Sequence, residues 1–268
     1  MSGANTLLGQ LYEAWRTAQP IAPLPPEALD RLEGYGLLLQ GLARRQAGGE
    51  RLSGWKVAFA GRAAQARFGL DEPVYGGLTA VMEVEPGSTV SFERLIQPKL
   101  EVELAFVFGR TLVAGDYGDE EILAAVTEVA PAFEIADCRW QGWRFGLGAF
   151  LADNAAAALY CVGQPVPFDP VRHACVAYHV EHEGVYLGSG DTQDREDSPL
   201  FNLCWLVRRL LADGHRVEAG QVVLSGALLA PMDIQSGTYH LHMLGTELAL
   251  DFHAGPVPAQ TPATVMDD

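Results

Sequence analysis

The first fifty positions of the chain carry apolar residues at helical spacing. Residues 6–17 form a short amphipathic run, and a proline-rich bend at 20–26 separates it from a second run. The second run begins at Pro26 and continues to Ala47, with leucines on one side and two glycines after its end. Proline at the first helical position and glycine after the last are common helix ends. We therefore predict helices over 6–17 and 26–47.

From residue 53 onward the apolar positions follow a different pattern. Short segments rich in valine, phenylalanine and leucine are bounded by glycine or proline, which is typical of β-strands. The predicted strands and hairpins are GWKVAFAG, STVSF, LEVELAFVFG, AALYCVG, CVAYHVEHEGVYLG, QVVLSGAL and TYHLHMLGTELALDFH. Two more helices are predicted between them, over 119–129 after an acidic turn and over 198–213 after a serine cap and a proline.

This order of elements indicates an α+β fold. We expect a helical N-terminal segment at residues 1–52 and a β-rich, mostly antiparallel catalytic domain at 53–254. Residues 255–268 combine prolines with small and polar residues and are predicted to be a disordered tail.

Composition and charge narrow the class of protein. The 268 residues are 49% hydrophobic and 19% charged, which is enough for a substantial core. A formal net charge of −16 argues against nucleic acid or an anionic membrane as a partner. No apolar stretch approaches the roughly 18 residues of a membrane span. The first residues lack the basic start of a secretory signal, and the four cysteines form no CxxC pair. We interpret the cysteines as buried residues of a cytoplasmic protein.

Lysine is rare, and its two positions are informative. Among 18 basic residues only Lys56 and Lys99 are lysines. Lys56 interrupts an apolar strand, so its ammonium must either reach solvent or face a polar pocket. An ammonium with a tunable pKa suits holding a substrate carboxylate or moving a proton. Lys99 follows Pro98 at a strand entrance and is interpreted as a surface or rim charge.

Two carboxylates lie two positions apart in the segment PKLEVELAF. On a strand, Glu101 and Glu103 point to the same face of the sheet. An exposed polar face is the simplest interpretation of such a pair, but the next residues on this face, Ala105 and Val107, are apolar. Two buried like charges need a counter-ion, and a set of carboxylates suits Mg²⁺ or Mn²⁺.

Further acidic residues interrupt apolar stretches later in the chain. Glu134, in PAFEIADCR, is a third candidate metal ligand. In the same segment Asp137 and Arg139 could pair with each other in a purely structural role. Asp153 and Asn154 stand between FLA and a run of alanines, which places polar groups in an apolar wall. Together these positions favour a metal–carboxylate enzyme over a structural cluster.

Other motifs give weaker signals. His179, Glu181 and Glu183 share a strand face, as do His240 and His242, but the first group adjoins a turn where charged residues are normally solvated. The acidic loop 191–197 lacks the ligand spacing and central glycine of a calcium loop. The chain has no GxSxG, Walker or dinucleotide-binding motif, so nucleophilic hydrolysis and nucleotide chemistry have no support.

Several segments resemble, in sequence and in order, the hydratase/decarboxylase branch of the fumarylacetoacetate hydrolase superfamily. They are GWKVAFAG, AAQARFGLDEPVYGGLTAVM, LIQPKLEVELAFVFGR, PAFEIADCRW, FLADNAAA and GQVVLSGAL. The branch includes 2-keto-4-pentenoate hydratases and 4-oxalocrotonate decarboxylases of aromatic catabolism. The resemblance spans roughly residues 26–253 and implies a β-roll-like fold and a homo-oligomer, or a complex with a related pathway enzyme.

The resemblance also implies a site and a substrate class. Substrates of the branch are small 2-oxo or 2-hydroxy dienoates, whose carboxylate and 2-oxygen chelate Mg²⁺ or Mn²⁺. The implied metal ligands are Glu101, Glu103 and Glu134, the implied catalytic residues are Lys56, Asp153 and Asn154, and the implied substrate-binding residues are Tyr75, Arg139 and Ser225.

Two departures from the branch bear on the reaction. Val74 stands where hydratases usually have aspartate, and Ala156 and Ala157 stand where they usually have serines. Both changes remove polar groups that could position water or move a proton. Val74 is closer to the pattern of the decarboxylases, whereas the two alanines fit neither reaction. Decarboxylation of a 4-oxalocrotonate type of substrate is therefore slightly favoured over hydration. The alternatives are an acylpyruvate-type C–C hydrolase and a diverged, non-catalytic partner subunit of an active relative.

Overall fold

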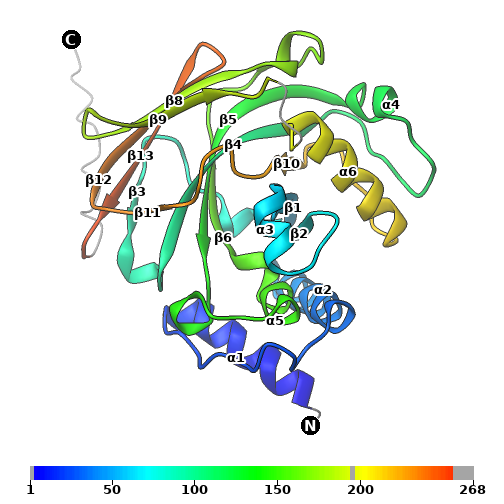
Figure 1. The fold of residues 1–268 in the computed structure, drawn as a ribbon, viewed down its shortest axis with the longest axis vertical. Helices are drawn as coiled ribbons and strands as arrows, with labels where there is room; N and C mark the ends of the chain where they lie inside the picture. Colours follow the sequence, from blue (N-terminus) through cyan, green and yellow to red (C-terminus); the bar gives the residue numbers. More distant parts are fainter. Residues whose placement is uncertain (1–2, 194–196, 256–268) are drawn as a thin grey trace, which may run out of the picture.

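The computed structural model describes residues 3–193 and 197–255. The helices and 3-10 turns are α1 (Gly3–Thr17), α2 (Arg31–Ala47), α3 (Arg62–Arg67), η1 (Ala80–Met82), η2 (Phe92–Arg94), α4 (Asp119–Leu123), η3 (Gln141–Trp143), α5 (Leu147–Ala152), η4 (Asn154–Ala156), η5 (Arg172–Ala174) and α6 (Pro199–Ala212). In Figure 1, α1, α2 and α5 gather below the sheets, and α6 lies to one side of them.

Two predicted helices are confirmed and two begin or end elsewhere. α1 covers the predicted 6–17 but begins earlier, at Gly3, and α6 lies within one residue of its prediction at each end. The Ser198 hydroxyl accepts the Phe201 amide at the start of α6. α2 begins at Arg31 rather than at Pro26, because Asp30 and Glu33 form a reciprocal capping box there. α4 covers only Asp119–Leu123 of the predicted 119–129, since strand pairing takes over at Val126.

The larger sheet has the strand order β2-β1-β10-β4-β5-β6, with β11 pairing to β4 and β7 to β5. Its strands are β1 (Leu52–Ala58), β2 (Val74–Thr79), β4 (Pro98–Phe108), β5 (Val126–Asp137), β6 (Ala157–Val162), β7 (Val166–Pro167), β10 (Val222–Leu224) and β11 (Met232–Asp233). β4 and β5 contain 11 and 12 residues and pair antiparallel from end to end. This long ladder carries the candidate metal ligands.

The second sheet has five strands in the order β3-β13-β12-β8-β9. Its strands are β3 (Thr89–Ser91), β8 (Ala177–His182), β9 (Val185–Asp191), β12 (Gly237–Met243) and β13 (Thr246–His253). The two predicted hairpins are confirmed as β8–β9 and β12–β13. Each turns through two residues with positive φ, 50° and 73° at Glu183 and Gly184 and 57° and 75° at Leu244 and Gly245. Such values match the right-handed twist of hairpin strands.

Both sheets are mixed, which corrects the expectation of a mostly antiparallel roll. β1 pairs in parallel with β10, and β13 pairs in parallel with β3. Alternation of apolar and polar residues has the same period in parallel and antiparallel strands, so the sequence pattern does not distinguish them. The described residues form a mixed α/β architecture whose sheets curl in Figure 1.

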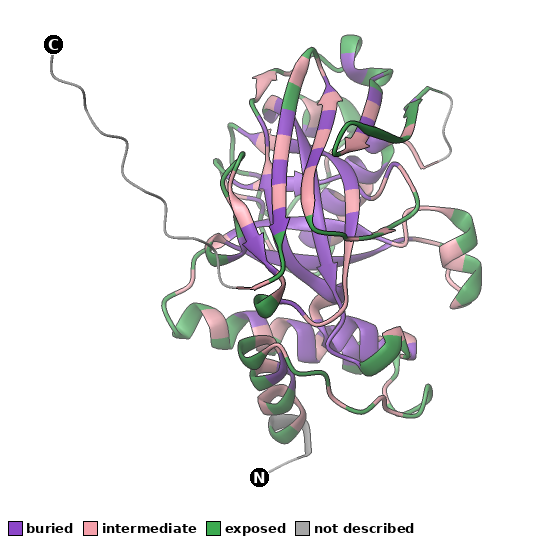
Figure 2. Ribbon diagram, turned by 90° about the vertical axis from the view of Figure 1, so that its left-hand side faces the viewer, coloured by how far each residue is buried: buried purple, intermediate pink, exposed green. Residues whose placement is uncertain are grey.

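The apolar core lies between the two sheets and beneath α2 and α6. Leu38 of α2, Trp55 of β1, Phe106 of β4 and Leu206 of α6 belong to one buried cluster. Figure 2 shows the strands of the larger sheet buried along most of their length, whereas the helices at the lower end are buried on one side and exposed on the other. The carboxylate-bearing strands therefore run through the interior of the protein.

Several smaller expectations can be compared with the described residues. Cys138, Cys161 and Cys204 are buried as predicted, but Cys175 is exposed. Within 3–193 and 197–255, no helix combines the length and apolarity that crossing a membrane requires. The predicted disordered tail lies, apart from Gly255, outside the described residues, as does part of the acidic loop 191–197.

Candidate active site

The three predicted metal ligands come together on the β4–β5 ladder. Glu101 of β4 lies directly opposite Glu134 of β5, and Glu103 lies two residues further along β4 on the same face. One carboxylate oxygen from each lies within 4.8 Å of the others, and no other group of three acidic, histidine or cysteine side chains in the described ranges does so. Glu103 and Glu134 are fully buried, whereas Glu101 is partly exposed.

Lys56 meets this group from β1. Its Nζ lies 2.9 Å from Glu134 Oε1, and its side chain is only 2% exposed. β10 separates β1 from β4 and places Lys56 beside Leu224, which in turn lies beside Ala105 on the glutamate face. The sequence left open whether the ammonium reaches solvent or a polar pocket. The structure places it in the pocket.

The carboxylates carry more negative charge than the protein neutralises. Burial and the charge of Glu134 raise the pKa of Glu101 to about 7. Burial, followed by the charges of Glu134 and Glu101, raises the pKa of Glu103 well above its usual range. Although burial opposes the charged ammonium, the carboxylate of Glu134 raises the pKa of Lys56. One ammonium thus faces three carboxylates.

Two of these oxygens have neither a hydrogen bond nor an ion pair. Glu103 Oε1 and Glu134 Oε2 are buried and have no partner of either kind among the described residues, whereas Glu134 Oε1 pairs with Lys56. Buried polar atoms are normally satisfied, so such an orphan calls for an explanation. A divalent cation with oxygen ligands would satisfy both atoms and offset the excess negative charge. The residues present therefore fit Mg²⁺ or Mn²⁺.

The loop after β10 closes over the carboxylates. The Gly226 amide donates to Glu103 Oε2 at 2.7 Å, and Gly226 has a φ of 92°. A Cβ at this position would lie 2.8 Å from the Ala60 side chain, so both backbone conformation and space require glycine. Sequence reasoning missed this contact because Gly226 and Glu103 are 123 residues apart.

A cavity of about 390 Å³ opens beside Lys56 and Glu101. Phe59, Phe145 and Phe150 line it, and the ring centroids of Phe59–Phe150 and Phe145–Phe150 lie 4.5 and 4.9 Å apart in stacked pairs. Phe59 lies on the strand motif GWKVAFAG, but nothing in the sequence indicates that the phenylalanines of 145 and 150 join it. The full lining is Lys56, Val57, Ala58, Phe59, Ala60, Gly61, Ala64, Arg67, Glu101, Ala136, Trp143, Phe145, Phe150, Ala155, Ala156, Asp197, Ala227, Leu228, Leu229, Ala230 and Pro231.

Asn154 shapes the cavity wall through its backbone. Asn154, Ala155 and Ala156 have φ values of 53°, 51° and 59°, a left-handed turn that is costly for residues other than glycine. The Asn154 amide holds this turn by accepting from the Gly77 N–H at 2.9 Å and donating to the Gly77 carbonyl at 2.8 Å. The side chain of Asn154 is therefore engaged with β2, and Ala155 and Ala156 face the cavity.

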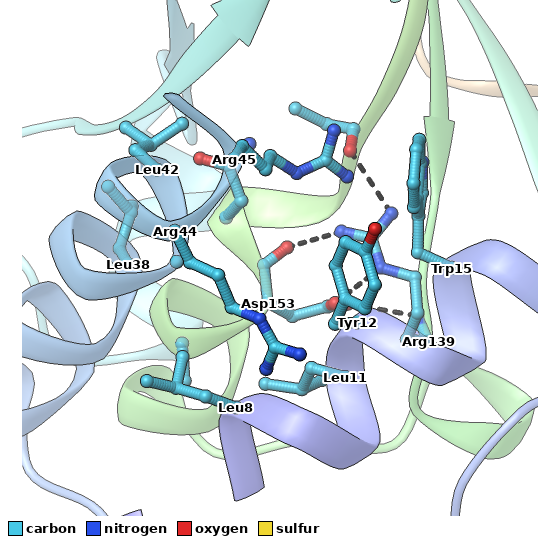
Figure 3. Close-up of a pocket in the computed structure, with 14 residues that line it drawn as sticks. Leu8, Leu11, Tyr12, Trp15, Leu38, Leu42, Arg44, Arg45, Arg139 and Asp153 are labelled. Atoms are coloured by element: carbon cyan, nitrogen blue, oxygen red, sulfur yellow. Dashed lines mark hydrogen bonds and ion pairs between the residues drawn. The ribbon is translucent and has the colours of Figure 1, made fainter. Parts of the chain in front are cut away.

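Asp153 and Arg139 form a separate buried cluster next to α1 and α2 (Figure 3). The Arg139 Nε donates to Asp153 Oδ1, and the Arg139 amide donates to Asp153 Oδ2 at 2.9 Å. The guanidinium also donates to the carbonyls of Asp137, Asp153 and Ala157. Neither residue lines the cavity above the carboxylates, although both had been assigned to the site from the resemblance.

The expected local pair between Asp137 and Arg139 takes a different form. Asp137 accepts the backbone amides of Ile96 and Gln97 at 2.8 and 2.7 Å, while Arg139 pairs with Asp153. Burial raises the pKa of Asp153 to about 6 even though Arg139 lowers it. Arg139 lines a small cavity of about 60 Å³ between α1 and α2, together with Asp153 and Asn154.

Tyr75 and Ser225, assigned to substrate binding by resemblance, contact the scaffold. The Tyr75 hydroxyl donates to Asp213 at 2.8 Å, and its ring packs against Tyr35 and Trp55. The Ser225 hydroxyl accepts the Leu104 amide at 3.1 Å. Neither residue lines the cavity beside Lys56.

The remaining charged motifs lie at the surface. Lys99 pairs with the exposed Asp233, as expected of a rim charge. His179 and His242 lie 3.6 and 3.8 Å from the two oxygens of Glu181 on the partly exposed face of the second sheet. Within the described part of the chain, these histidines do not gather three ligand atoms as the glutamates do.

Sequence comparison finds relatives of the chain that are named hydratases. It is 35% identical over 232 residues to a 2-hydroxyhexa-2,4-dienoate hydratase of Comamonas testosteroni, covering 83% of this chain and 86% of the relative. It is 31% identical over 244 residues to a 2-keto-4-pentenoate hydratase of Burkholderia vietnamiensis strain G4, covering 90% and 93%. No protein-family model matches the chain.

Solved structures share the fold of the chain. The fold matches the 4-oxalocrotonate decarboxylase of Pseudomonas putida G7, complexed with magnesium and adipate, with a TM-score of 0.87 at 22% identity over 93% of this chain and 97% of that one. The fumarylpyruvate hydrolase of Pseudomonas aeruginosa, in complex with Mn²⁺ and pyruvate, gives a TM-score of 0.55 at 17% identity over 75% and 89%. From its sequence relatives, its motifs and its fold, the chain belongs to the hydratase/decarboxylase branch of the fumarylacetoacetate hydrolase superfamily, a branch of lyases.

Proposed function

We propose that the protein is a Mg²⁺- or Mn²⁺-dependent lyase that acts on a small 2-oxo or 2-hydroxy dienoate in the cytoplasm. The observation that carries the proposal is the set of three clustered carboxylates with two buried oxygens that lack a hydrogen-bond partner. Glu101, Glu103 and Glu134 would hold the cation. When bound, a divalent cation supplies an electron sink at the 2-oxo oxygen of the substrate.

Lys56 is the proton carrier of the proposed site. Its ammonium lies 2.9 Å from Glu134 Oε1 and also borders the cavity, so it can contact both a carboxylate of the site and a substrate. Since Glu134 favours the charged form, Lys56 is an ammonium at neutral pH. It can hold a substrate carboxylate or donate a proton to the carbon skeleton as electron density builds there.

Decarboxylation is the reaction we favour. The walls beside Lys56 are phenylalanines and alanines, including Ala155 and Ala156. Val74 is fully buried on β2 and lies on the same strand face as Gly76. This face adjoins Lys56, because a Cβ added at Gly76 would lie 3.3 Å from Lys56 Cε. This face offers no group that would position an attacking water. Loss of carbon dioxide needs a sink for electrons and one proton.

Hydration is the second candidate. The relatives with 31–35% identity are named hydratases, which favours this reaction on grounds of descent. Hydration would require Lys56 or Glu101 to activate water, because these are the titratable groups at the cavity floor. Acylpyruvate hydrolysis and a non-catalytic role as partner subunit remain weaker proposals, and a homo-oligomer is proposed from the resemblance alone.

The test is an ultraviolet assay of the purified protein with 4-oxalocrotonate and with 2-hydroxypentadienoate, each with Mg²⁺, with Mn²⁺ and after chelation by EDTA. We expect turnover of 4-oxalocrotonate that requires a metal and is lost in Lys56→Met. Turnover of only 2-hydroxypentadienoate would replace decarboxylation by hydration. Activity that survives complete metal removal would overturn the metal-dependent lyase, and a folded, metal-loaded protein inactive on both substrates would favour the non-catalytic alternative.

A further inference from the structure

The cavity holds a second cation that the reaction described above does not use. Arg67, the last residue of α3, lines the cavity together with Lys56. Whereas the charge of Lys56 is directed to Glu134, Arg67 forms no ion pair within residues 3–193 and 197–255. The Arg67 guanidinium makes a cation–π contact with the ring of Phe68, whose centroid lies 5.3 Å from the guanidinium carbon.

Arg67 lies at the rim, and the carboxylates lie at the floor. Arg67 is exposed, whereas Lys56 is 2% exposed and Glu134 fully buried. Between them the wall is aromatic: Phe59 and Phe150 line the cavity, with ring centroids 4.5 Å apart. Phe68, next to Arg67, does not line the cavity but stacks on Phe59 at 4.9 Å. A ligand that spans the cavity would therefore meet a polar floor, an apolar middle and a cationic rim.

The position of α3 is fixed against the strand that carries Lys56. The Gln65 side-chain amide donates to the carbonyls of Phe59 and Ala60 at 3.0 and 2.9 Å. These carbonyls follow β1 directly, so α3 is attached to the end of the strand whose middle bears Lys56. The arginine two residues after Gln65 is therefore held near the cavity, although no residue of α3 is itself buried.

Arg62, at the other end of α3, provides a comparison. It lines a neighbouring groove of about 730 Å³ with Asp71 and Glu72, and it does not line the cavity beside Lys56. The same short helix thus carries one arginine toward the candidate active site and another away from it. Of the two arginines of α3, Arg67 is therefore the one placed to contact a substrate.

We propose that Arg67 binds an anionic group at the far end of the substrate, so that the site selects 2-oxo acids that carry a second carboxylate. The inference rests on the proposed function in one respect, that the 2-oxo acid end is held at the glutamates. An arginine at the rim forms charge-assisted hydrogen bonds with a carboxylate. Because the protein carries a net charge of −16, a cation at the rim favours the binding of a dianion.

The experiment compares 2-oxoadipate with 2-oxohexanoate, which have the same chain length and 2-oxo acid end but differ in the distal carboxylate. Binding is measured by isothermal titration calorimetry on the full chain with saturating Mg²⁺. We expect the unchanged protein to bind 2-oxoadipate about tenfold more tightly, the effect of a partly desolvated charged hydrogen bond. Arg67→Gln should remove this preference, and Arg67→Lys should restore part of it.

Arg62→Gln is the matched control and should keep the preference for 2-oxoadipate. The affinity for Mg²⁺ should be unchanged in both Arg62→Gln and Arg67→Gln. Absence of the preference in the unchanged protein, or its persistence in Arg67→Gln, would overturn the role of Arg67. If neither compound binds, the glutamate site for 2-oxo acids fails together with the inference. If the preference depends on Arg67 but no dienoate is turned over, the selection of a dicarboxylate stands and the proposed reaction fails.

Discussion

Two clusters of buried charged residues differ in how their charges are balanced. In one, Lys56 faces Glu101, Glu103 and Glu134. In the other, Arg139 pairs with Asp153 and donates to three backbone carbonyls. The first has an excess of carboxylates and buried oxygens without partners, whereas the second gives the guanidinium and the carboxylate partners of their own.

The difference separates a candidate reaction site from a structural connection. An arginine–aspartate pair with its hydrogen bonds complete has no capacity left for a ligand, and removing either partner leaves the other charge buried. A carboxylate cluster with unsatisfied oxygens is costly as it stands and becomes favourable when a cation binds. Both clusters interrupt apolar sequence with polar residues, so residue type alone did not distinguish them.

The largest expected effect is on metal binding by the carboxylate cluster. Glu103→Gln removes a ligand charge while preserving size, so we expect at least a hundredfold loss of Mg²⁺ affinity and loss of activity. Relief of repulsion among the glutamates should leave the metal-free protein at least as stable as before. Calorimetric titration and thermal melting measure the two quantities. Glu128→Gln, a partly buried glutamate of β5 away from the cluster, should change neither.

Asp153→Asn should have the opposite effects, lowering the stability of the protein and leaving its Mg²⁺ affinity nearly unchanged. It leaves the guanidinium of Arg139 buried without its counter-ion, which typically costs about 3–5 kcal/mol of the free energy of unfolding. Urea denaturation of the metal-free protein measures the loss. Mg²⁺ affinity of the folded variant should stay within about threefold of the original, since Asp153 does not border the carboxylates. A stable variant with lost metal binding would reverse the assignment of the two clusters.

The pH dependence of the stabilisation by Mg²⁺ should also separate the clusters. The pKa of Glu101 is about 7 in the folded protein against an ordinary value of 4.5, so the folded metal-free state binds the extra proton. Stability of the metal-free protein should therefore fall as pH rises from about 4.5 to 7. Mg²⁺ binds the ionised carboxylates, so the melting temperature gained from Mg²⁺ should grow over the same interval. A gain independent of pH would contradict the titration of Glu101 at this site.

The smallest effect is expected at the second lysine. Lys99 pairs with Asp233, which is 84% exposed, and an ion pair of this kind contributes little. Lys99→Gln should change the free energy of unfolding by no more than about 0.5 kcal/mol and leave metal affinity and activity as they were. Urea denaturation and the ultraviolet assay check this, and a large loss of activity would give Lys99 a part in the site that its position does not indicate.

Much of the fold was predictable because its signals are local. The hairpins at Glu183 and Leu244, the helix after Ser198 and the strand bearing Glu101 follow from patterns within about fifteen residues. The start of α2 was placed too early because Pro26 is a plausible helix start, whereas the capping box at Asp30 sets the actual start. Parallel pairing of β1 with β10 joins segments about 170 positions apart and leaves no mark on either pattern.

The site divides in the same way. Alternation along β4 was enough to place Glu101 and Glu103 on one face, and the apolar surroundings of Lys56 and Glu134 were enough to suggest that their charges need partners. The roles of Asp153 and Arg139 were not predictable, because an acidic residue in an apolar segment gives the same sequence pattern whether it faces a cavity or an arginine. Gly226 and Arg67 had no local signal at all.

The pattern along the chain was therefore sufficient for many of its strands, although not for β2 or β5, and for the buried positions whose charges need partners. Periodicity and the cost of burial act on neighbouring residues, so the sequence records them. Folding decided which of those charges became balanced. Curling of the larger sheet brings Lys56 to Glu134, the loop after β10 brings Gly226 to Glu103, and α5 and η4 turn Asp153 toward Arg139. The physical reason is that the electrostatic state of a buried group depends on partners that are distant in sequence, and only their positions in space determine whether an oxygen remains free to bind a cation.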